Sequence, residues 1–161
     1  MKRWLLRITV LVSISIGSYF FGYARGDTAS ISEEQKEREE QFTHSMTNVV
    51  LKGKFTMNGR ETDPTVERYT IERVEKMAGD IWLFHARIEY GKTDVTLPVP
   101  VKLLWAGDTP VVTLTEAPIP GLGTFSVRLL FYENSYTGLW SSPNNGGFQF
   151  GEIINENHLT N

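Results

Sequence analysis

The sequence predicts an all-β protein: an eight-stranded antiparallel up-and-down barrel, preceded by an N-terminal membrane or signal helix and a short polar helix. Three observations carry this prediction. From Asn48 onward the hydrophobic period is two, the period of a strand, and short turns rich in Gly and Asn separate the strands. The chain has 161 residues, which is room for one ordinary domain and an accessory segment. It contains no cysteine, so packing alone must hold the core.

Residues 1–26 have the pattern of an export segment. Three basic residues precede an apolar run over residues 8–21, as in cleaved signal peptides and in retained signal-anchor helices. Residues 4–23 have the length of a membrane-spanning helix and an aromatic residue at each end. We predict an exported bacterial protein of the cell envelope, anchored by this helix, with its C-terminal domain outside the cytoplasm. The alternative is cleavage after Ala24 or Gly26, which would give a secreted or periplasmic protein.

Residues 27–47 are predicted to form a polar helical stalk. Ser32 and Gln35 have the spacing of a capping box, and acidic residues follow Ser32 as they do at helix N-termini. Apolar residues are nearly absent until Phe42 and Met46. The helix is therefore expected to be surrounded by solvent.

Residues 48–155 are predicted to form the barrel, and residues 156–161 a flexible tail. The strand segments read NVVLKGKFTM, VERYTIERVEKM, DIWLFHARIEY, DVTLPVPVKLLW, PVVTLTE, GTFSVRLLFYE, SYTGLWSS and GFQFGEI. Turn residues such as Asn58-Gly59, Gly91-Lys92 and Glu133-Asn134 separate them. Because no helical segment interrupts this succession, we expect sequential hairpins that wind into a closed barrel or, alternatively, a flattened sandwich.

The distribution of apolar residues over the strand faces supports a barrel. In three strands one face is apolar: Trp82, Phe84, Ala86, Ile88 and Tyr90; Val95, Leu97, Val99, Val101, Leu103 and Trp105; Phe125, Val127, Leu129 and Phe131. Pro98 and Pro100 lie on the opposite face of their strand and have no N–H to donate. This strand is therefore expected to have an unpaired edge or a bulge at the prolines.

The segment YTGLWSSPNNGGFQFGEI is interpreted as the terminal hairpin of the fold. Its aromatic residues alternate with glycines, and a glycine in a strand allows a ring or another backbone to approach closely. The residues concerned are Tyr136, Gly138, Trp140, Phe148, Phe150 and Gly151. We expect the four rings to seal the core.

This order of elements, and YTGLW followed by GGFQFGEI in particular, resembles the closing hairpin of small exported bacterial β-domain proteins of unknown function. The succession of eight up-and-down strands is similar to lipocalin-like and avidin-like barrels. This resemblance implies a barrel that encloses its own apolar side. The first strand carries Gly53-Lys54-Phe55 where the lipocalin pattern has Gly-x-Trp, and no functional residue is transferred from either family.

Charge and motifs exclude several classes of function. After the four basic residues of the first 25 positions, 12 Lys and Arg remain against 19 Asp and Glu. Nucleic acid is therefore not an expected partner, since binding it requires a dense basic face. No nucleotide-binding, zinc-protease or nucleophile-elbow motif is present in the sequence. We predict no enzyme activity, no catalytic residue, no metal site and no cofactor.

The predicted ligand-binding residues fall into two sets. Aromatic residues expected to line the interior are Trp82, Phe84, Trp105, Phe131 and Trp140. The polar residues His85, Arg87 and Arg128 lie on the second face of their strands. If that face lined the interior, they would fix the polar end of a ligand. If it faced water, as the apolar opposite face indicates, they would be solubilising cross-strand pairs.

These features predict two main competing functions; a third alternative, an enzyme on the barrel rim, would depend on His85 with Glu89 or Arg87. In the first, the exported barrel binds a small hydrophobic or amphipathic ligand, which requires an apolar cavity of at least about 300 Å³. In the second, the domain has a solid core, binds no ligand and serves as a structural or protein-interaction module of the envelope. The volume of the interior separates the two, because a core packed to ordinary protein density leaves no space for a ligand.

Overall fold

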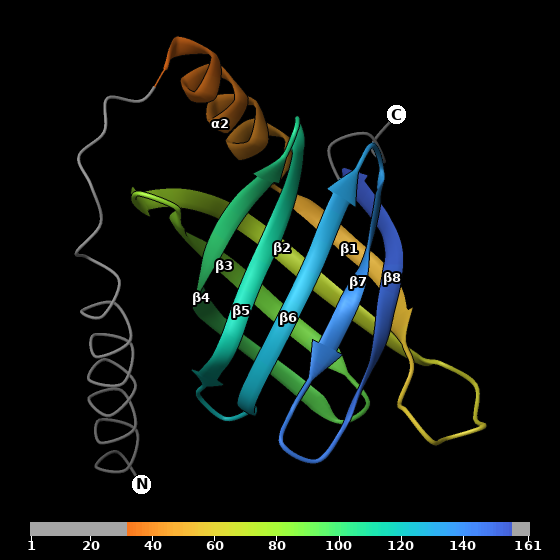
Figure 1. Ribbon diagram of the computed structural model, residues 1–161. Helices are drawn as coiled ribbons and strands as arrows, with labels where there is room; N and C mark the ends of the chain where they lie inside the picture. The colour runs from red at the N-terminus through yellow and green to blue at the C-terminus, as the bar shows by residue number, and fades with distance from the viewer. Residues whose placement is uncertain (1–31, 156–161) are drawn as a thin grey trace, which may run out of the picture.

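The computed structural model describes residues 32–155, and eight strands in this range close into one barrel (Figure 1). The strands are β1 (Val49–Phe55), β2 (Thr65–Ala78), β3 (Ile81–Tyr90), β4 (Thr93–Ala106), β5 (Thr109–Ile119), β6 (Gly123–Tyr132), β7 (Ser135–Ser141) and β8 (Gly146–Asn155). Each strand pairs antiparallel with the next in sequence, and β8 pairs with β1. The predicted all-β class and up-and-down order are confirmed, and the sandwich alternative is wrong.

The apolar faces predicted for β3, β4 and β6 point into the barrel. Trp82 and Leu103 are each 1% exposed, and Phe131 is 5% exposed. Turns with glycine in the left-handed region join the strands, for example at Gly79 (φ 54°) and Gly107 (φ 68°). In these strands the alternation of apolar residues and the glycine turns agree with the fold. These two features are enough to set the strand register.

Strand β4 pairs with β5 over only part of its length. The residues Thr93–Lys102 pair with β3, whereas only Lys102–Ala106 pair with β5. The Leu103 N–H donates to the Asp80 carbonyl on the β3 side. Backbone N–H groups alternate in direction along a strand, so those of the even-numbered positions of β4 point toward β5. Pro98 and Pro100 are even-numbered and lack an N–H, which explains why the β4–β5 ladder ends before it reaches them. The unpaired edge predicted at the prolines is confirmed.

Helix α2 (Glu33–Ser45) lies across one end of the barrel (Figure 1). It begins after Ser32, whose hydroxyl accepts a hydrogen bond of 3.2 Å from the Gln35 N–H, as the capping spacing predicted. The helix differs from the expected solvated stalk because Phe42 is 5% exposed and enters the end of the barrel. Phe42 docks the helix together with the ion pair between the buried Glu39 and Lys76 of β2.

The closing hairpin of β7 and β8 buries only part of its aromatic set. Tyr136 is 1% exposed and Trp140 is half-buried. Phe148 and Phe150 are 58% and 42% exposed, so the expectation that they seal the core is wrong. Among the inward positions of β8 is Gly151, where an added Cβ would collide with the Tyr136 ring. Gly151 thus makes room for the Tyr136 ring of β7.

The predicted membrane or signal helix falls on residues 1–26, and the predicted tail on residues 156–161, both outside the described residues. Within residues 32–155, no helix combines the length and the hydropathy that a membrane crossing requires.

Candidate functional site

The interior of the barrel contains a cavity of about 350 Å³, to which all eight strands contribute side chains. Its middle section is lined by small and branched apolar side chains such as Ala86, Val99, Leu114 and Leu129. This volume falls in the range of small-molecule sites, roughly 300 to 1,000 Å³. The interior is therefore not a solid core.

The end of the cavity near helix α2 is closed by aromatic packing. The Phe42 ring meets Trp82 and Trp105 edge to face, with centroids 5.4 and 6.0 Å apart. It also lies against Phe84 and Phe131, at 6.2 and 6.5 Å. Rings in such geometry exclude water and gain more than their buried area alone would provide.

The opposite end of the barrel carries the entrance. The lining there includes Met57, Leu122, Ser142 and Asn145, which lie in the turns that join β1 to β2, β5 to β6 and β7 to β8. Asn145 is exposed, so the cavity reaches the surface at this end. Trp140 stands beside the entrance, and its indole N–H donates to the Thr56 carbonyl at 3.1 Å. The bond fixes one wall of the opening.

One wall of the cavity carries a buried carboxyl group. Glu67 is only 2% exposed. Its Oε1 accepts a hydrogen bond of 2.9 Å from the Tyr136 hydroxyl, and its Oε2 accepts one of 2.8 Å from the Tyr69 hydroxyl. The amide oxygen of Gln149, which is 4% exposed, lies 3.5 Å from the Tyr69 hydroxyl. We call Glu67, Tyr69, Tyr136 and Gln149 the polar corner.

Burial shifts the pKa values of the polar corner. Desolvation raises the pKa of the Glu67 carboxyl, and the hydrogen bonds from Tyr69 and Tyr136 counteract it in part. Desolvation also raises the pKa of the Tyr69 and Tyr136 hydroxyls, and the nearby Glu67 raises both further. Both tyrosines therefore remain donors at neutral pH.

Two glycines allow Tyr136 to reach Glu67 across the sheet. Tyr136 pairs with Gly151, Gly151 with Gly53, and Gly53 with Glu67, so the four residues form one row across β7, β8, β1 and β2. A Cβ added at Gly53 would collide with the Tyr136 hydroxyl, and one added at Gly151 would collide with the ring. The Tyr136 side chain therefore lies along the wall over both glycines. Any larger residue at either position would push it away from the carboxyl.

The structure separates the predicted aromatic residues into two groups. Phe84, Phe131 and Trp140 line the cavity. Trp82 and Trp105 pack instead on Phe42 at the helix end. Arg38 of α2 stacks over Trp105 at 5.1 Å from the ring centroid and donates to the Gly107 carbonyl, which ties the helix to the β4–β5 turn.

The predicted polar residues His85, Arg87 and Arg128 lie on the outer face of the barrel, and none of them lines the cavity. Arg87 holds Asp94 in a bidentate pair with distances of 2.8 and 2.7 Å. Arg128 donates to the Leu114 carbonyl and to the Thr115 hydroxyl. These are cross-strand surface pairs, the arrangement expected when this face meets water.

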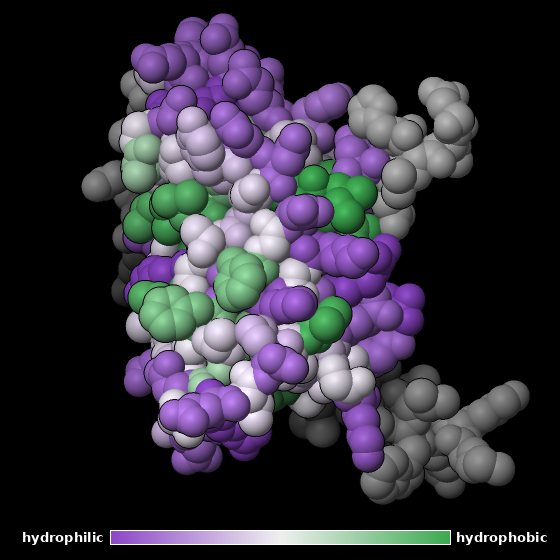
Figure 2. All heavy atoms as spheres, turned by 90° about the vertical axis from the view of Figure 1, so that its right-hand side faces the viewer, coloured by the Kyte–Doolittle hydropathy of each residue, from purple (hydrophilic) through white to green (hydrophobic). Residues whose placement is uncertain are grey.

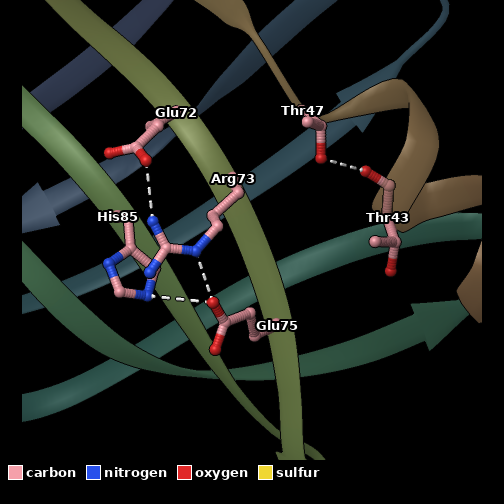
Figure 3. A network of polar contacts seen from close by, with 6 residues as sticks. All are labelled: Thr43, Thr47, Glu72, Arg73, Glu75 and His85. Atoms are coloured by element: carbon pink, nitrogen blue, oxygen red, sulfur yellow. Dashed lines mark hydrogen bonds and ion pairs between the residues drawn. The ribbon is translucent and has the colours of Figure 1, made fainter.

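Figure 3 shows the surroundings of His85 on this outer face. Its Nε2 lies 3.4 Å from Glu75, which is an ion pair only when the imidazole is protonated. Arg73 lies between Glu72 and Glu75 and pairs with both carboxylates (Figure 3). The Glu75 carboxylate is thus already satisfied by arginine. The His85 Nε2 itself is buried and has no hydrogen-bond partner among the described residues.

Sequence reasoning did not find Glu67, Tyr69 or Gln149. The sequence signal was weak, because Glu67 and Tyr69 belong to a strand with polar residues on both faces, and Gln149 is flanked by two aromatic residues that look more suitable for a core. The useful clue was the pair of glycines at positions 53 and 151, which marks where the Tyr136 side chain lies flat against the inner surface of the sheet.

Other candidate sites are weaker. In the part of the chain that the structure describes, no cluster of three or more His, Cys, Asp or Glu residues could hold a metal ion. A second depression, of about 600 Å³, lies beside α2 and is lined by Met46, Thr109, Glu133 and Asn134 among others. It is larger than the interior cavity but more polar, and it lies outside the ring of packed aromatics. The interior cavity is the better candidate because its walls are apolar and a buried polar group converges on it.

Fold and site together define a closed antiparallel eight-stranded barrel with an internal cavity and one buried polar corner. Comparisons with protein-family models, with curated proteins and with solved structures find no significant match.

Proposed function

We propose that this protein is an exported binding protein of the cell envelope, whose barrel encloses one small apolar or amphipathic molecule. The observation that carries the proposal is the cavity of about 350 Å³ with apolar walls and a buried polar corner. Protein cores are packed as densely as organic crystals, so a void of this size is unusual in a barrel that serves only as a scaffold.

The arrangement of the cavity suits a guest with two chemical ends. Apolar side chains such as Val112, Leu114 and Val127 surround most of the volume, while polar groups gather on one wall. Small-molecule sites commonly combine an apolar wall with a few polar groups that fix the orientation of the ligand. The unbroken order of β1 to β8 also supports the likeness to lipocalin-like barrels, and fold alone carries no ligand class.

Filling the cavity by mutation tests this function. Ala86 faces the cavity from β3, so Ala86→Phe places a ring inside it. Thr96→Phe adds the same ring at an exposed position of β4 and serves as the matched control. The full chain is purified in phosphatidylcholine nanodiscs, and molecules that copurify are identified by mass spectrometry after extraction. We expect one apolar or amphipathic species with the wild type and the control, and its loss with Ala86→Phe. The same recovery from all three proteins would contradict the proposal.

The envelope location is proposed from the basic start and the apolar span at residues 4–23. Because the chain has no cysteine, a single Thr96→Cys substitution reports which side of the membrane the barrel occupies. A membrane-impermeant maleimide added to intact cells should label this cysteine. In cells with an outer membrane, that membrane is permeabilised first. Labelling only after lysis would place the barrel in the cytoplasm and contradict the proposal.

A second candidate function, a protein-interaction module, is supported by the outer face of β6 to β8. Apolar side chains are exposed there, among them Tyr132 (60%), Leu139 (52%) and Phe148 (58%). Figure 2 shows green apolar side chains on this side of the molecule, scattered among purple polar ones. Replacing Leu139 and Phe148 together by Ser should weaken self-association or partner binding in analytical ultracentrifugation. No change in sedimentation would leave the cavity as the only supported function.

A further inference from the structure

The Glu67 carboxyl faces the cavity, and no cation from the described part of the chain balances it. It is 2% exposed, and in residues 32–155 no Lys, Arg or His forms a salt bridge with it or lines the cavity. A buried carboxylate normally pairs with a cation or binds a metal, because removing its charge from water is costly. Its two tyrosine donors satisfy part of its hydrogen-bonding capacity and supply no positive charge.

The polar corner still has free acceptor capacity. Each Glu67 carboxylate oxygen can accept two hydrogen bonds and receives one, from Tyr136 at Oε1 and from Tyr69 at Oε2. The Tyr69 oxygen and the Gln149 amide oxygen add two more acceptors beside it. Acceptors of hydrogen bonds, grouped around one negative charge, therefore predominate. An ammonium group has a positive charge and three donors, which matches this set.

We propose that the ligand of this cavity is an amphipathic amine, whose cationic head group binds the polar corner at Glu67 while its apolar body fills the rest of the cavity. This inference rests on the proposed function and specifies the ligand class of the same site. The ammonium group would donate a charge-assisted hydrogen bond to the Glu67 carboxylate and further hydrogen bonds to the Tyr69 and Gln149 oxygens.

The same corner discriminates against other head groups. A carboxylate ligand would bring a second negative charge beside Glu67 in a low-dielectric interior, where repulsion is strong. A hydroxyl ligand can donate one hydrogen bond but leaves the Glu67 charge unbalanced. The charge of the chain after residue 25, with 12 basic against 19 acidic residues, also attracts cations and repels anions. We therefore expect the affinity order amine, alcohol, acid.

Binding of an amine should depend on pH. Burial raises the pKa of Glu67, so protons compete with the amine for this carboxyl, and affinity falls as the pH is lowered through that pKa. The titratable groups facing Glu67 are Tyr69 and Tyr136, with Tyr90 next to Tyr69, and raised pKa values keep Tyr69 and Tyr136 neutral over this range. The carboxyl is thus the group whose titration controls binding.

The test measures decylamine, decanol and decanoate binding to the full chain in phosphatidylcholine nanodiscs at pH 7, by calorimetry with empty nanodiscs as the reference. Glu67→Gln keeps the size of the side chain and one acceptor oxygen, removes the charge and replaces the second oxygen by an NH2 donor. Glu75→Gln removes a carboxylate from the outer face of the same strand and is the matched control. Loss of a charge-assisted hydrogen bond predicts about 10- to 100-fold weaker decylamine binding to Glu67→Gln. Decanol binding should change by less than about threefold.

Each outcome decides between the two proposals. Decylamine binding that is tightest for the wild type, weakened by Glu67→Gln and unaffected by Glu75→Gln supports the inference. If decanol binds as tightly as decylamine, and Glu67→Gln changes neither, the amine assignment is overturned while the binding function stands. If the wild type binds none of the three more than empty nanodiscs do, both proposals fail.

Discussion

The two ends of the barrel are built from the same eight strands but are filled differently. At the helix end, Phe42 from outside the sheet completes a ring of aromatic side chains, and the interior is packed. Toward the other end no segment enters, and the interior opens into a cavity bordered by a buried carboxyl group. The strands of this barrel therefore do not fill its interior by themselves. Where the Phe42 ring enters, the interior is packed, and where no side chain enters from outside the sheet, a cavity remains.

Removing the ring at the closed end should have the largest effect. Phe42→Ala leaves Trp82, Trp105 and Phe131 without their shared neighbour, and truncation of a buried Phe costs about 3–5 kcal/mol. We expect this loss in the free energy of unfolding from chemical denaturation. Leu139→Ala on the outer face, where the side chain is 52% exposed, is the control. A loss no larger than that of the control would mean that the helix does not contribute to the core.

Blocking the path of Tyr136 at the open end should have the next largest effect. Gly53→Ala places a methyl group against the Phe150 carbonyl oxygen and the Tyr136 hydroxyl, and overpacking of this kind costs about 3 kcal/mol at its upper range. Lys52→Ala changes the neighbouring outward position and should be nearly silent. Equal stability of the two variants in denaturant would show that the wall has more space than its geometry indicates.

Removing one donor from the polar corner should have a smaller effect. Tyr136→Phe leaves Glu67 with only the Tyr69 hydroxyl, and a hydrogen bond to a charged group contributes about 1.5 kcal/mol at the low end of its range. The same substitution at Tyr132, which is 60% exposed, should cost less than about 0.5 kcal/mol. If thermal denaturation gave the two variants the same stability, the polar corner would contribute nothing to the fold.

The pH dependence of stability gives the smallest and most specific difference. Because the pKa of Glu67 is raised in the folded state above its ordinary value of 4.5, the folded protein binds this proton more tightly than the unfolded chain. The resulting stability is fully present below the unfolded pKa and is lost as the pH rises through the folded pKa. Glu67→Gln has no carboxyl group to titrate and lacks this pH-dependent contribution to stability. The variant should therefore gain stability relative to the wild type as the pH rises above 4.5, measured by urea unfolding in the absence of ligand. A difference independent of pH would contradict the assigned shift.

The strands and their order were predictable because local signals and the fold agree. In β3, β4 and β6 the apolar residues recur at every second position, and turns with Gly or Asn limit each strand. The prolines of β4 also marked its unpaired edge correctly. These features depend on residues that are neighbours in sequence, and a single sequence contains that information.

The site was less predictable because it depends on irregular register. Strand β2 has a register shift between Ile71 and Arg73, so Glu67 and Ile71 face inward while Arg73 and Glu75 face outward. Strict alternation places all four on one face and makes Glu67 look like an ordinary surface residue.

In β8 hydropathy misleads in a similar way, since the barrel buries Gln149 and exposes the phenylalanines beside it. The docking of Phe42 depends on which end of the barrel the helix meets, and no local pattern encodes this.

The central claim is that the space inside the barrel accepts a small apolar guest. The most direct test is methyl NMR of the full chain in phosphatidylcholine nanodiscs, titrated with decanol, a neutral probe that does not depend on the charge of Glu67. Leu114 and Leu129 face the cavity, whereas Leu130 and Leu139 belong to the outer face. We expect saturable chemical-shift changes at the Leu114 and Leu129 methyl groups, with the outer methyl groups unchanged. Changes confined to Leu130 and Leu139, or none at any of the four, would contradict it.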